Sequence, residues 1–241
     1  PHLVLAPLDI PDCVYTSAWA VNLAQQLQSA AIVLSDQFIG QSTAVISEPR
    51  RRTNEPVVST GEGNDYLRYR LTESGVSTLA APGDPGQRFT ADGLEHNQTG
   101  TPSAQDSDHQ LQLEKRARKL TDHDYGDAWG RVSGSGPVAM IGCGSASAAV
   151  EEAADVLAHE GLETRSIALR LLAPLQGDQL LAALAGCQRI VVVEQNHSAQ
   201  LYRYLRGQLD FSGSLHSYAV AGPVPLNSAR VAQFVREIVE Q

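Results

Sequence analysis

A polar run at the end of an apolar stretch contains residue types that could transfer protons. Glu194-Gln195-Asn196-His197-Ser198 directly follows the β-favouring residues 190–193. In an open α/β sheet the carboxyl ends of the strands face the ligand crevice, where a glutamate beside an amide and an imidazole could act in acid–base chemistry. The same run could instead cap the helix expected over 199–209, with Asn196 or Ser198 as the cap, or contact another domain. Both interpretations remain open.

A glycine-containing turn is the second candidate. Gly142-Cys143-Gly144-Ser145-Ala146-Ser147 follows an apolar strand pattern and opens a helical one, which is where a dinucleotide-binding fingerprint lies. A helix N-terminus with free backbone amides favours a pyrophosphate. However, Ser147 replaces the third glycine, and the next strand ends at 169–171 without an acidic residue for a ribose hydroxyl, although Arg170 could suit a 2′-phosphate. The turn therefore predicts either a tight structural junction or an NADP-type nucleotide-binding module.

The middle of the chain contains two further polar clusters. Glu95, His96 and Asn97 are consecutive in a loop-like region, and they are candidates for an interface or a position near a site, or simply for an exposed loop. Residues 122–124 read Asp-His-Asp. Because adjacent side chains on a loop rarely converge on one ion, we expect a solvated charge run there and no metal site.

Composition excludes several classes of protein. The net charge of -9 argues against nucleic-acid binding, and no apolar run approaches the ~20 residues that span a membrane. Cys13, Cys143 and Cys187 are too far apart in the chain for a disulfide framework or an iron–sulfur ligand set. Only Lys115 and Lys119 are lysines, and their polar, helix-like surroundings argue against a buried catalytic lysine.

Hydrophobic periodicity divides the chain into three parts. Residues 1–46 show a strand at 2–6, a helix at 14–28 and a strand at 31–34, which is a βαβ unit. Residues 47–135 predict an extended irregular connection with one helix at 110–120, capped by Ser107 or Asp108. Residues 136–241 alternate strands at 137–141, 166–169, 189–193 and 216–219 with helices, which predicts an α/β fold with a doubly wound, mostly parallel sheet.

The loop motifs and their order resemble the α subunits of 2-oxoacid:ferredoxin oxidoreductases, above all those acting on 2-oxoglutarate. The motifs are Tyr69-Arg70-Leu71-Thr72-Glu73-Ser74-Gly75-Val76-Ser77, Ala81-Pro82-Gly83, Asp92-Gly93-Leu94-Glu95-His96-Asn97 with Gly100, Asp108-His109 and Lys115-Arg116-Ala117-Arg118-Lys119-Leu120. Ile32–Gln37 resembles the end of that family's pyrimidine-binding domain, and 191–196 resembles a strand of its transketolase C-terminal-like domain. Ala199 departs from the pattern, since the family usually has glycine before Gln200.

The resemblance implies a particular architecture and activity. Residues 1–46 would be the last part of a thiamine-diphosphate pyrimidine-binding domain, 47–135 a connection and 136–241 a transketolase C-terminal-like domain. The activity would be oxidative decarboxylation of a 2-oxoacid, with 2-oxoglutarate as the expected substrate, to an acyl-coenzyme A, with electrons passing to ferredoxin. The cofactors would be thiamine diphosphate with Mg and an iron–sulfur cluster in the assembled complex, with none bound by this chain alone.

The resemblance also implies partners. A β subunit would carry the diphosphate domain and the cluster, the missing N-terminal portion of the α subunit would complete the sheet, and the complex would be cytoplasmic. Because the chain begins at Pro1 and lacks the family's cofactor glutamate, we expect a fragment with no catalytic residue of its own. Its interface or near-site candidates are Asp36, Gln37, Glu95, His96, Asn97, Glu194 and Asn196. A docking domain that has lost the activity is the alternative.

Overall fold

The computed structural model describes residues 2–48 and 66–240, which form two compact units. The first unit contains residues 2–3, 19–31 and 66–125, and the second contains residues 4–18, 32–48 and 126–240. The part of the predicted connection at 49–65 lies outside the described residues. Each unit is considered by itself.

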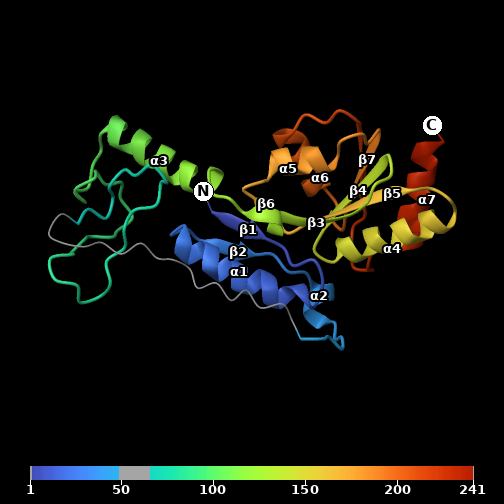
Figure 1. Ribbon diagram of the computed structural model, residues 1–241, viewed down its shortest axis with the longest axis horizontal. Coiled ribbons are helices and arrows are strands. Elements are labelled where there is room, and N and C mark those ends of the chain that lie inside the picture. Colours follow the sequence, from blue (N-terminus) through green and yellow to red (C-terminus); the bar gives the residue numbers. More distant parts are fainter. Residues whose placement is uncertain (1, 49–65, 241) are drawn as a thin grey trace. The chain divides into compact units, whose positions relative to one another are not determined.

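A five-stranded sheet forms the centre of the second unit (Figure 1). Its strands, in spatial order, are β3 (Gly130–Gly134), β5 (Thr164–Leu169), β4 (Val138–Cys143), β7 (Arg189–Glu194) and β8 (Ser214–Ala219). The last four are parallel, and β3 pairs antiparallel with β5. The strand order reverses between β4 and β7, which makes their carboxyl ends a topological switch point where ligands bind in folds of this kind.

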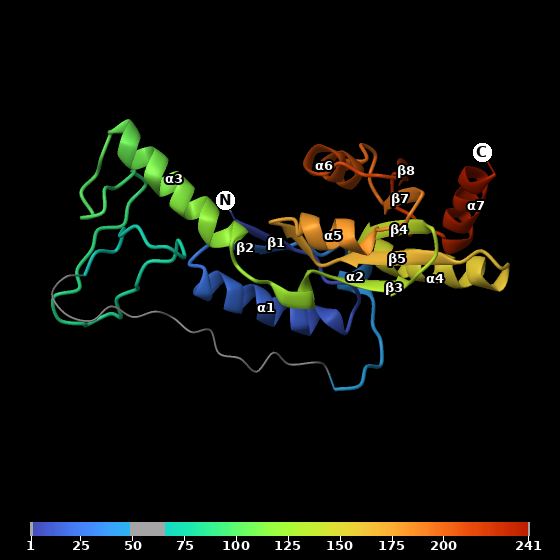
Figure 2. The same cartoon turned by 45° about the horizontal axis from the view of Figure 1, so that its top comes forward.

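Helices cover both faces of this sheet (Figure 2). On one face α4 (Ala146–His159) and α7 (Ser228–Val239) pack together, and their apolar residues share a core with β4 and β7. That core includes Met140, Leu157, Val191 and Val235, all fully buried. On the other face lie α5 (Gly177–Ala183) and α6 (Gln200–Gln208). The predicted doubly wound, mostly parallel α/β arrangement is confirmed.

The sheet begins earlier than the sequence indicated. β3 lies inside the stretch predicted as irregular connection, before residue 136, and a short 3₁₀ helix, η1 (Gly126–Trp129), leads into it. Backbone pairing with β5, rather than an apolar repeat of its own, makes 130–134 a strand, since three of its five residues are exposed. The division of the chain into three domains otherwise stays a prediction.

A separate three-stranded sheet has the order β2-β1-β6. The predicted strand, helix and strand are β1 (Leu3–Leu5), α1 (Asp12–Gln26) and β2 (Ala31–Val33), followed by a short helix α2 (Gln37–Gln41). β6 (Leu171–Ala173) pairs antiparallel with β1. The sequence did not predict β6, because only Arg170 separates it from the end of β5 and no turn residue marks it as a separate strand.

In the first unit, turns and loops of residues 66–105 pack against the long helix α3 (Asp106–Thr121). The helix begins before the predicted residue 110, and its N-cap is Gln105, without a side-chain cap bond. The prediction of Ser107 or Asp108 as the cap was therefore wrong. Ser107 and Asp108 lie inside the first turn of the helix. The carboxylates of Asp106 and Asp108 in that turn interact favourably with the helix N-terminus.

Buried contacts hold the loops to α3. Gln112 Nε2 donates to Tyr69 O at 2.8 Å, and Arg118 donates to the carbonyl oxygens of Thr72 and Glu73, each at 2.9 Å. Gly75, with φ +75°, lies so close that a Cβ there would be 2.6 Å from Lys115 O. The motif at 69–77 is thus shaped by its contact with the helix.

One buried ion pair in the second unit joins Arg170, which lies between β5 and β6, to Asp12 at the start of α1. Arg170 donates to Asp12 through Nε (3.0 Å) and through Nη2 (2.8 Å), and the two side chains are only 11% and 10% exposed. Burial tends to raise the pKa of Asp12, but the hydrogen bonds from Arg170 and from Leu8 N outweigh it, so that pKa lies below its ordinary value. We expect Asp12→Asn to lower the free energy of unfolding by about 3 kcal/mol, because it leaves a buried guanidinium without its counter-ion.

The measurement is urea unfolding at several pH values, with Asp155→Asn on the exposed surface of α4 as the control. The stability that ionised Asp12 contributes is complete above its unfolded pKa of about 3.9 and is lost as the pH falls below that value. The difference between the wild type and Asp12→Asn should therefore shrink below about pH 4. A variant as stable as the wild type at pH 7 would contradict this account of the pair.

Candidate functional site

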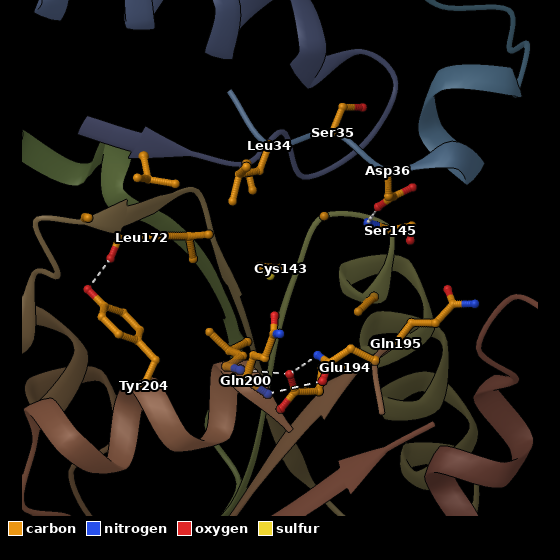
Figure 3. Close-up of a pocket in the computed structure, with 17 residues that line it drawn as sticks. Leu34, Ser35, Asp36, Cys143, Ser145, Leu172, Glu194, Gln195, Gln200 and Tyr204 are labelled. Carbon is orange, nitrogen blue, oxygen red and sulfur yellow. Dashed lines mark hydrogen bonds between the residues drawn. The ribbon is translucent and has the colours of Figure 1, made fainter. Parts of the chain in front are cut away.

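A cavity of about 430 Å³ lies at the switch point, where β4 and β7 end (Figure 3). Its walls, all in the second unit, come from the ends of β4 and β7 with the turns that follow them, the starts of α4 and α6, the β1 and β6 segments, and the segment after β2. The lining residues are Val4, Ala6, Leu34, Ser35, Asp36, Cys143, Gly144, Ser145, Ala146, Leu172, Ala173, Glu194, Gln195, Asn196, Gln200, Leu201 and Tyr204. Of the predicted candidates, the structure brings Asp36, Glu194 and Asn196 together here.

Glu194 and Asn196 cap helix α6. The buried Glu194 carboxylate accepts the amides of Leu201 (2.8 Å) and Tyr202 (3.0 Å), as well as the side-chain amide of Asn196. Asn196 Oδ1 in turn accepts the amides of Ser198 (3.0 Å) and Gln200 (3.2 Å). The carboxylate thus satisfies the free N–H groups of the first helical turn, where negative charge is also favoured. The capping interpretation of this run is confirmed for Asn196.

This cap forces one residue into an unusual conformation. Ala199, the N-cap of α6, has φ +50° and ψ +53°, the left-handed region that glycine adopts without a steric cost. Glu194 and Asn196 supply the capping bonds that the Ala199 side chain cannot. The departure from the glycine expected before Gln200 is therefore a local backbone strain, tolerated because two other side chains hold the turn.

Asp36 occupies the N-terminus of the other helix at the switch point. Its Oδ2 accepts the amide of Ser145 at 2.8 Å, and its Oδ1 accepts the amide of Ile39 at 3.0 Å, so one carboxylate binds the start of α4 and caps α2. A Cβ on Gly144 would lie 2.9 Å from Asp36 Oδ2, and Gly144 has φ +58°. Glycine is thus required for the carboxylate to approach.

The same geometry bears on the nucleotide-binding interpretation of 142–147. Asp36 holds the position at the helix N-terminus that a pyrophosphate would take. Arg170, the residue that could suit a 2′-phosphate, is bound to Asp12 and to Ala128 O. Both groups that would recognise a dinucleotide are engaged by the protein itself, which favours a structural junction.

The cysteine in this cavity is not an activated nucleophile. Burial, followed by the neighbouring charges of Glu194 and Asp36, raises the pKa of Cys143 to about 12, so the thiol stays protonated at neutral pH. The pKa values of Cys13 and Cys187 are also raised, mainly by burial. Among the described residues no group of three or more His, Cys, Asp and Glu side chains is arranged to hold a metal ion.

Gln37 lies apart from the cavity. It is the exposed first residue of α2, and its Nε2 donates to Gln41 Oε1 at 3.3 Å. Its neighbour Asp36 performs the capping, so the structure gives Gln37 no contact with the switch point.

Glu95 is the centre of a second cluster, in the first unit. It accepts two hydrogen bonds from Arg116, at 3.0 and 2.6 Å, and lies 2.8 Å from His109 Nδ1. The hydrogen bonds from Arg116 lower the pKa of Glu95 to about 2, against an opposing effect of burial. Glu95 is therefore ionised at any physiological pH and ties the 92–103 loop to α3.

His96 and Asn97 also have roles within the loop. His96 is buried and stacks on Tyr69, with ring centroids 4.4 Å apart and planes 10° from parallel. Its Nε2 lies 3.4 Å from Asp92 Oδ1, beyond good hydrogen-bond geometry. Asn97 Oδ1 accepts the amides of Thr99 and Thr101, each at 3.1 Å, and so closes a tight turn.

The burial of Lys115 and part of the switch-point lining were not predicted from the sequence. The sequence argued against a buried lysine, yet Lys115 is only 6% exposed, because the 69–77 loop folds over it. At the switch point, sequence reasoning missed Gln200 and Tyr204. Tyr204 donates to Leu172 O at 2.6 Å, and the only signal in the sequence was a polar hydroxyl on an otherwise apolar helix face.

The second unit is thus an α/β domain with a parallel sheet and a capped switch point. Comparison with known proteins indicates which family of α/β proteins the chain resembles. No family model matches the chain. The α subunit of 2-oxoacid:ferredoxin oxidoreductase 2 from Aeropyrum pernix is 28% identical over 252 residues, covering 100% of this chain and 38% of the relative. The KorA subunit of 2-oxoglutarate synthase from Methanothermobacter marburgensis is 25% identical over 214 residues, covering 85% of this chain and 55% of the relative.

A solved structure agrees with these relatives. The 2-oxoglutarate:ferredoxin oxidoreductase from Magnetococcus marinus, with 2-oxoglutarate, coenzyme A and succinyl-CoA bound, is 32% identical with a TM-score of 0.86. The match covers 98% of this chain and 42% of that one. The chain belongs to the family of 2-oxoacid:ferredoxin oxidoreductase α subunits, and it spans roughly two fifths to one half of the relatives that it matches. No described helix is long and apolar enough to cross a membrane.

The α6 cap predicts two opposite changes in stability. Glu194→Gln keeps the shape of the side chain but loses the charge that accepts the helix amides, so we expect it to lower the free energy of unfolding by roughly 2 kcal/mol. Ala199→Gly relieves the left-handed strain and should raise it by about 1 kcal/mol.

Urea unfolding measures both changes, with the exposed Glu163→Gln as a control for the loss of one negative charge. If Ala199→Gly were destabilising, the left-handed conformation at this position would not be the source of the strain.

Proposed function

We propose that this chain is part of the α subunit of a thiamine-diphosphate-dependent 2-oxoglutarate:ferredoxin oxidoreductase, which converts 2-oxoglutarate and coenzyme A to succinyl-coenzyme A and reduces ferredoxin. The supporting observation is the match to the Magnetococcus marinus enzyme along 98% of the chain at a TM-score of 0.86. The curated relatives, all α or KorA subunits of such oxidoreductases, support the same family.

The described residues do not fit the cofactors of such an enzyme. Of the helix N-termini at the switch point, one holds Asp36 and the other holds Glu194, so neither is open to a diphosphate. The three free cysteines lie apart, and their thiols have raised pKa values, which disfavours iron–sulfur ligation. Thiamine diphosphate, Mg and the iron–sulfur cluster would therefore be held by the remaining polypeptide and by a β subunit.

The edge of the three-stranded sheet supports a role in a larger body. β2 is the terminal strand of the order β2-β1-β6, and Ile32, Val33 and Leu34 are 38–48% exposed. Leu3 N donates to Ala30 O and Leu34 N donates to Leu5 O, so the even-numbered residues bond to β1. In a parallel pair the odd-numbered Ala31 and Val33 then direct their N–H and C=O groups outward. We infer that a strand of the missing part of the α subunit pairs with this edge.

Substitution at the outward-facing position tests this pairing. Val33→Pro removes one N–H group of the free edge and leaves the β1–β2 bonds in place. We expect it to destabilise the full-length α subunit by about 1–3 kcal/mol, the cost of a lost buried hydrogen bond, and to change the 241-residue chain by less. Thermal and urea unfolding of both proteins measure the difference, and Val33→Thr, which keeps the N–H group, is the control. Equal effects in the two proteins would contradict the pairing.

The activity is tested on the assembled complex. An affinity tag at the C-terminus of the full-length subunit should recover a brown complex that contains a second subunit, iron and thiamine diphosphate. It should reduce ferredoxin or methyl viologen with 2-oxoglutarate only when coenzyme A is present, and several-fold faster than with pyruvate.

A complex that assembles but contains no thiamine diphosphate and shows no activity with either 2-oxoacid would favour the docking-domain alternative. Activity of the 241-residue chain without any partner would contradict the proposal that the cofactors are held by other polypeptides.

A further inference from the structure

Both lysines of the chain line one cavity in the first unit. The chain has 18 lysine and arginine residues, and only Lys115 and Lys119 are lysines. They lie one turn apart on α3 and face a cavity of about 290 Å³. The other lining residues are Gln28, Arg68, Tyr69, Gly75, Val76, Ser77, Leu79, Phe89, Ala91, Gln112 and Arg116. This cavity is separate from the switch point and belongs wholly to the first unit.

The ammonium groups are held by neutral acceptors. Lys115 Nζ donates to Ser77 Oγ, and the Ser77 hydroxyl donates in turn to Arg70 O at 2.8 Å. Lys119 Nζ donates to Gln28 O at 2.7 Å. Each ammonium has three N–H donors, and in the described part of the chain we find one acceptor for each. Both ammonium groups can therefore donate to a further acceptor.

The charged groups nearest to the lysines are positive. Arg68, which lies 5.8 Å from the centre of the Phe89 ring, lines the cavity, and no carboxylate of residues 2–48 or 66–240 pairs with it or with either lysine. The carboxylate of Glu95 is engaged by Arg116 and His109. Burial, and then repulsion from Arg68 and neighbouring cations, lowers the pKa values of Lys115 and Lys119 to about 8.

Such an arrangement is unfavourable unless an anion completes it. A buried charge without a counter-ion costs free energy, and three cations around one small space repel one another. An anion in the cavity would reverse both effects and could accept bonds from the free donors of the lysines and of Arg68, whose planar guanidinium suits a carboxylate.

We propose that this cavity is a binding site for a small organic carboxylate. Arg68, Lys115 and Lys119 supply the positive charge of the lining, and Val76, Leu79, Phe89 and Ala91 supply its apolar part. An aliphatic acid of a few carbons would match both. Because Lys115 is only 6% exposed, a molecule that enters the cavity can reach it, whereas a flat protein surface cannot. The proposal does not depend on the activity proposed above.

The scarcity of lysine allows a direct test. Protein labelled with [ε-¹³C]lysine gives two side-chain signals in the NMR spectrum, one from Lys115 and one from Lys119, which Lys119→Arg assigns. In the chain without ligand both signals should titrate near pH 8. Saturating succinate should shift both titrations upward by one pH unit or more, since an anion favours the charged amine. Inorganic phosphate at the same ionic strength should have a several-fold weaker affinity, because it cannot use the apolar wall.

Two variants separate binding from folding. Lys115→Met replaces the buried ammonium with an apolar chain of similar length, and Arg68→Gln removes the guanidinium; each should weaken succinate binding at least tenfold by calorimetry while leaving the thermal midpoint without ligand unchanged or higher. Arg88→Gln is the control, since it removes one positive charge from an exposed position of the same unit that does not line the cavity.

Three results would overturn the proposal. One is a lysine titration that succinate does not shift. Another is a phosphate effect as large as that of succinate, which would leave no role for the apolar wall. The third is a full-length complex in which both lysines titrate above pH 10 before any anion is added, because a carboxylate of another subunit would then occupy the site.

Discussion

Where parallel strands end side by side, each strand leads into a helix whose first N–H groups have no partner within the helix. These N–H groups need hydrogen-bond acceptors from elsewhere. In this chain two carboxylates accept hydrogen bonds from these N–H groups. Glu194 binds the start of α6, and Asp36 binds the starts of both α2 and α4. Each position is one where a phosphate or substrate group is bound in other sheets of this type. The switch point is consequently a satisfied structural joint, and its surroundings follow from that.

The caps explain several local features together. Gly144 has to be glycine because Asp36 Oδ2 lies against it, and Ala199 adopts a left-handed conformation because the side chains of Glu194 and Asn196 close the turn in its place. Burial, together with the negative charges of Glu194 and Asp36, raises the pKa of Cys143 and keeps its thiol protonated. A cavity of about 430 Å³ remains between these groups, but its acidic groups are already engaged in holding helices. Shape alone suggests a binding site here, and the hydrogen bonds add that both of its carboxylates already hold helix N-termini.

The loops of residues 66–105 in the first unit have few regular hydrogen bonds of their own and pack against α3. Polar contacts with α3 replace a sheet: Glu95 with Arg116, Gln112 with Tyr69 O, and Arg118 with two loop carbonyls. These contacts order the family's loop motifs into a wall around the lysine cavity. The price of that order is a concentration of cations under partial cover, which is the chemical reason to expect an anion there.

The sequence by itself determined the α/β class, most of the strands and helices, and the family. Periodicity is a local property, so residues 190–193 indicate a buried strand and Gly161, with φ +84°, marks the end of α4, whatever surrounds them. Only the tertiary structure decided that β6 pairs with β1, that α3 begins at Asp106 and that Lys115 is buried. It also decided that other residues of the chain bind the side chains of Asp36 and Arg170. Ser145, whose amide Asp36 accepts, and Asp12, to which Arg170 donates, each lie more than a hundred residues from that partner in the chain. Such contacts depend on how distant segments meet, which no local pattern of residue types specifies.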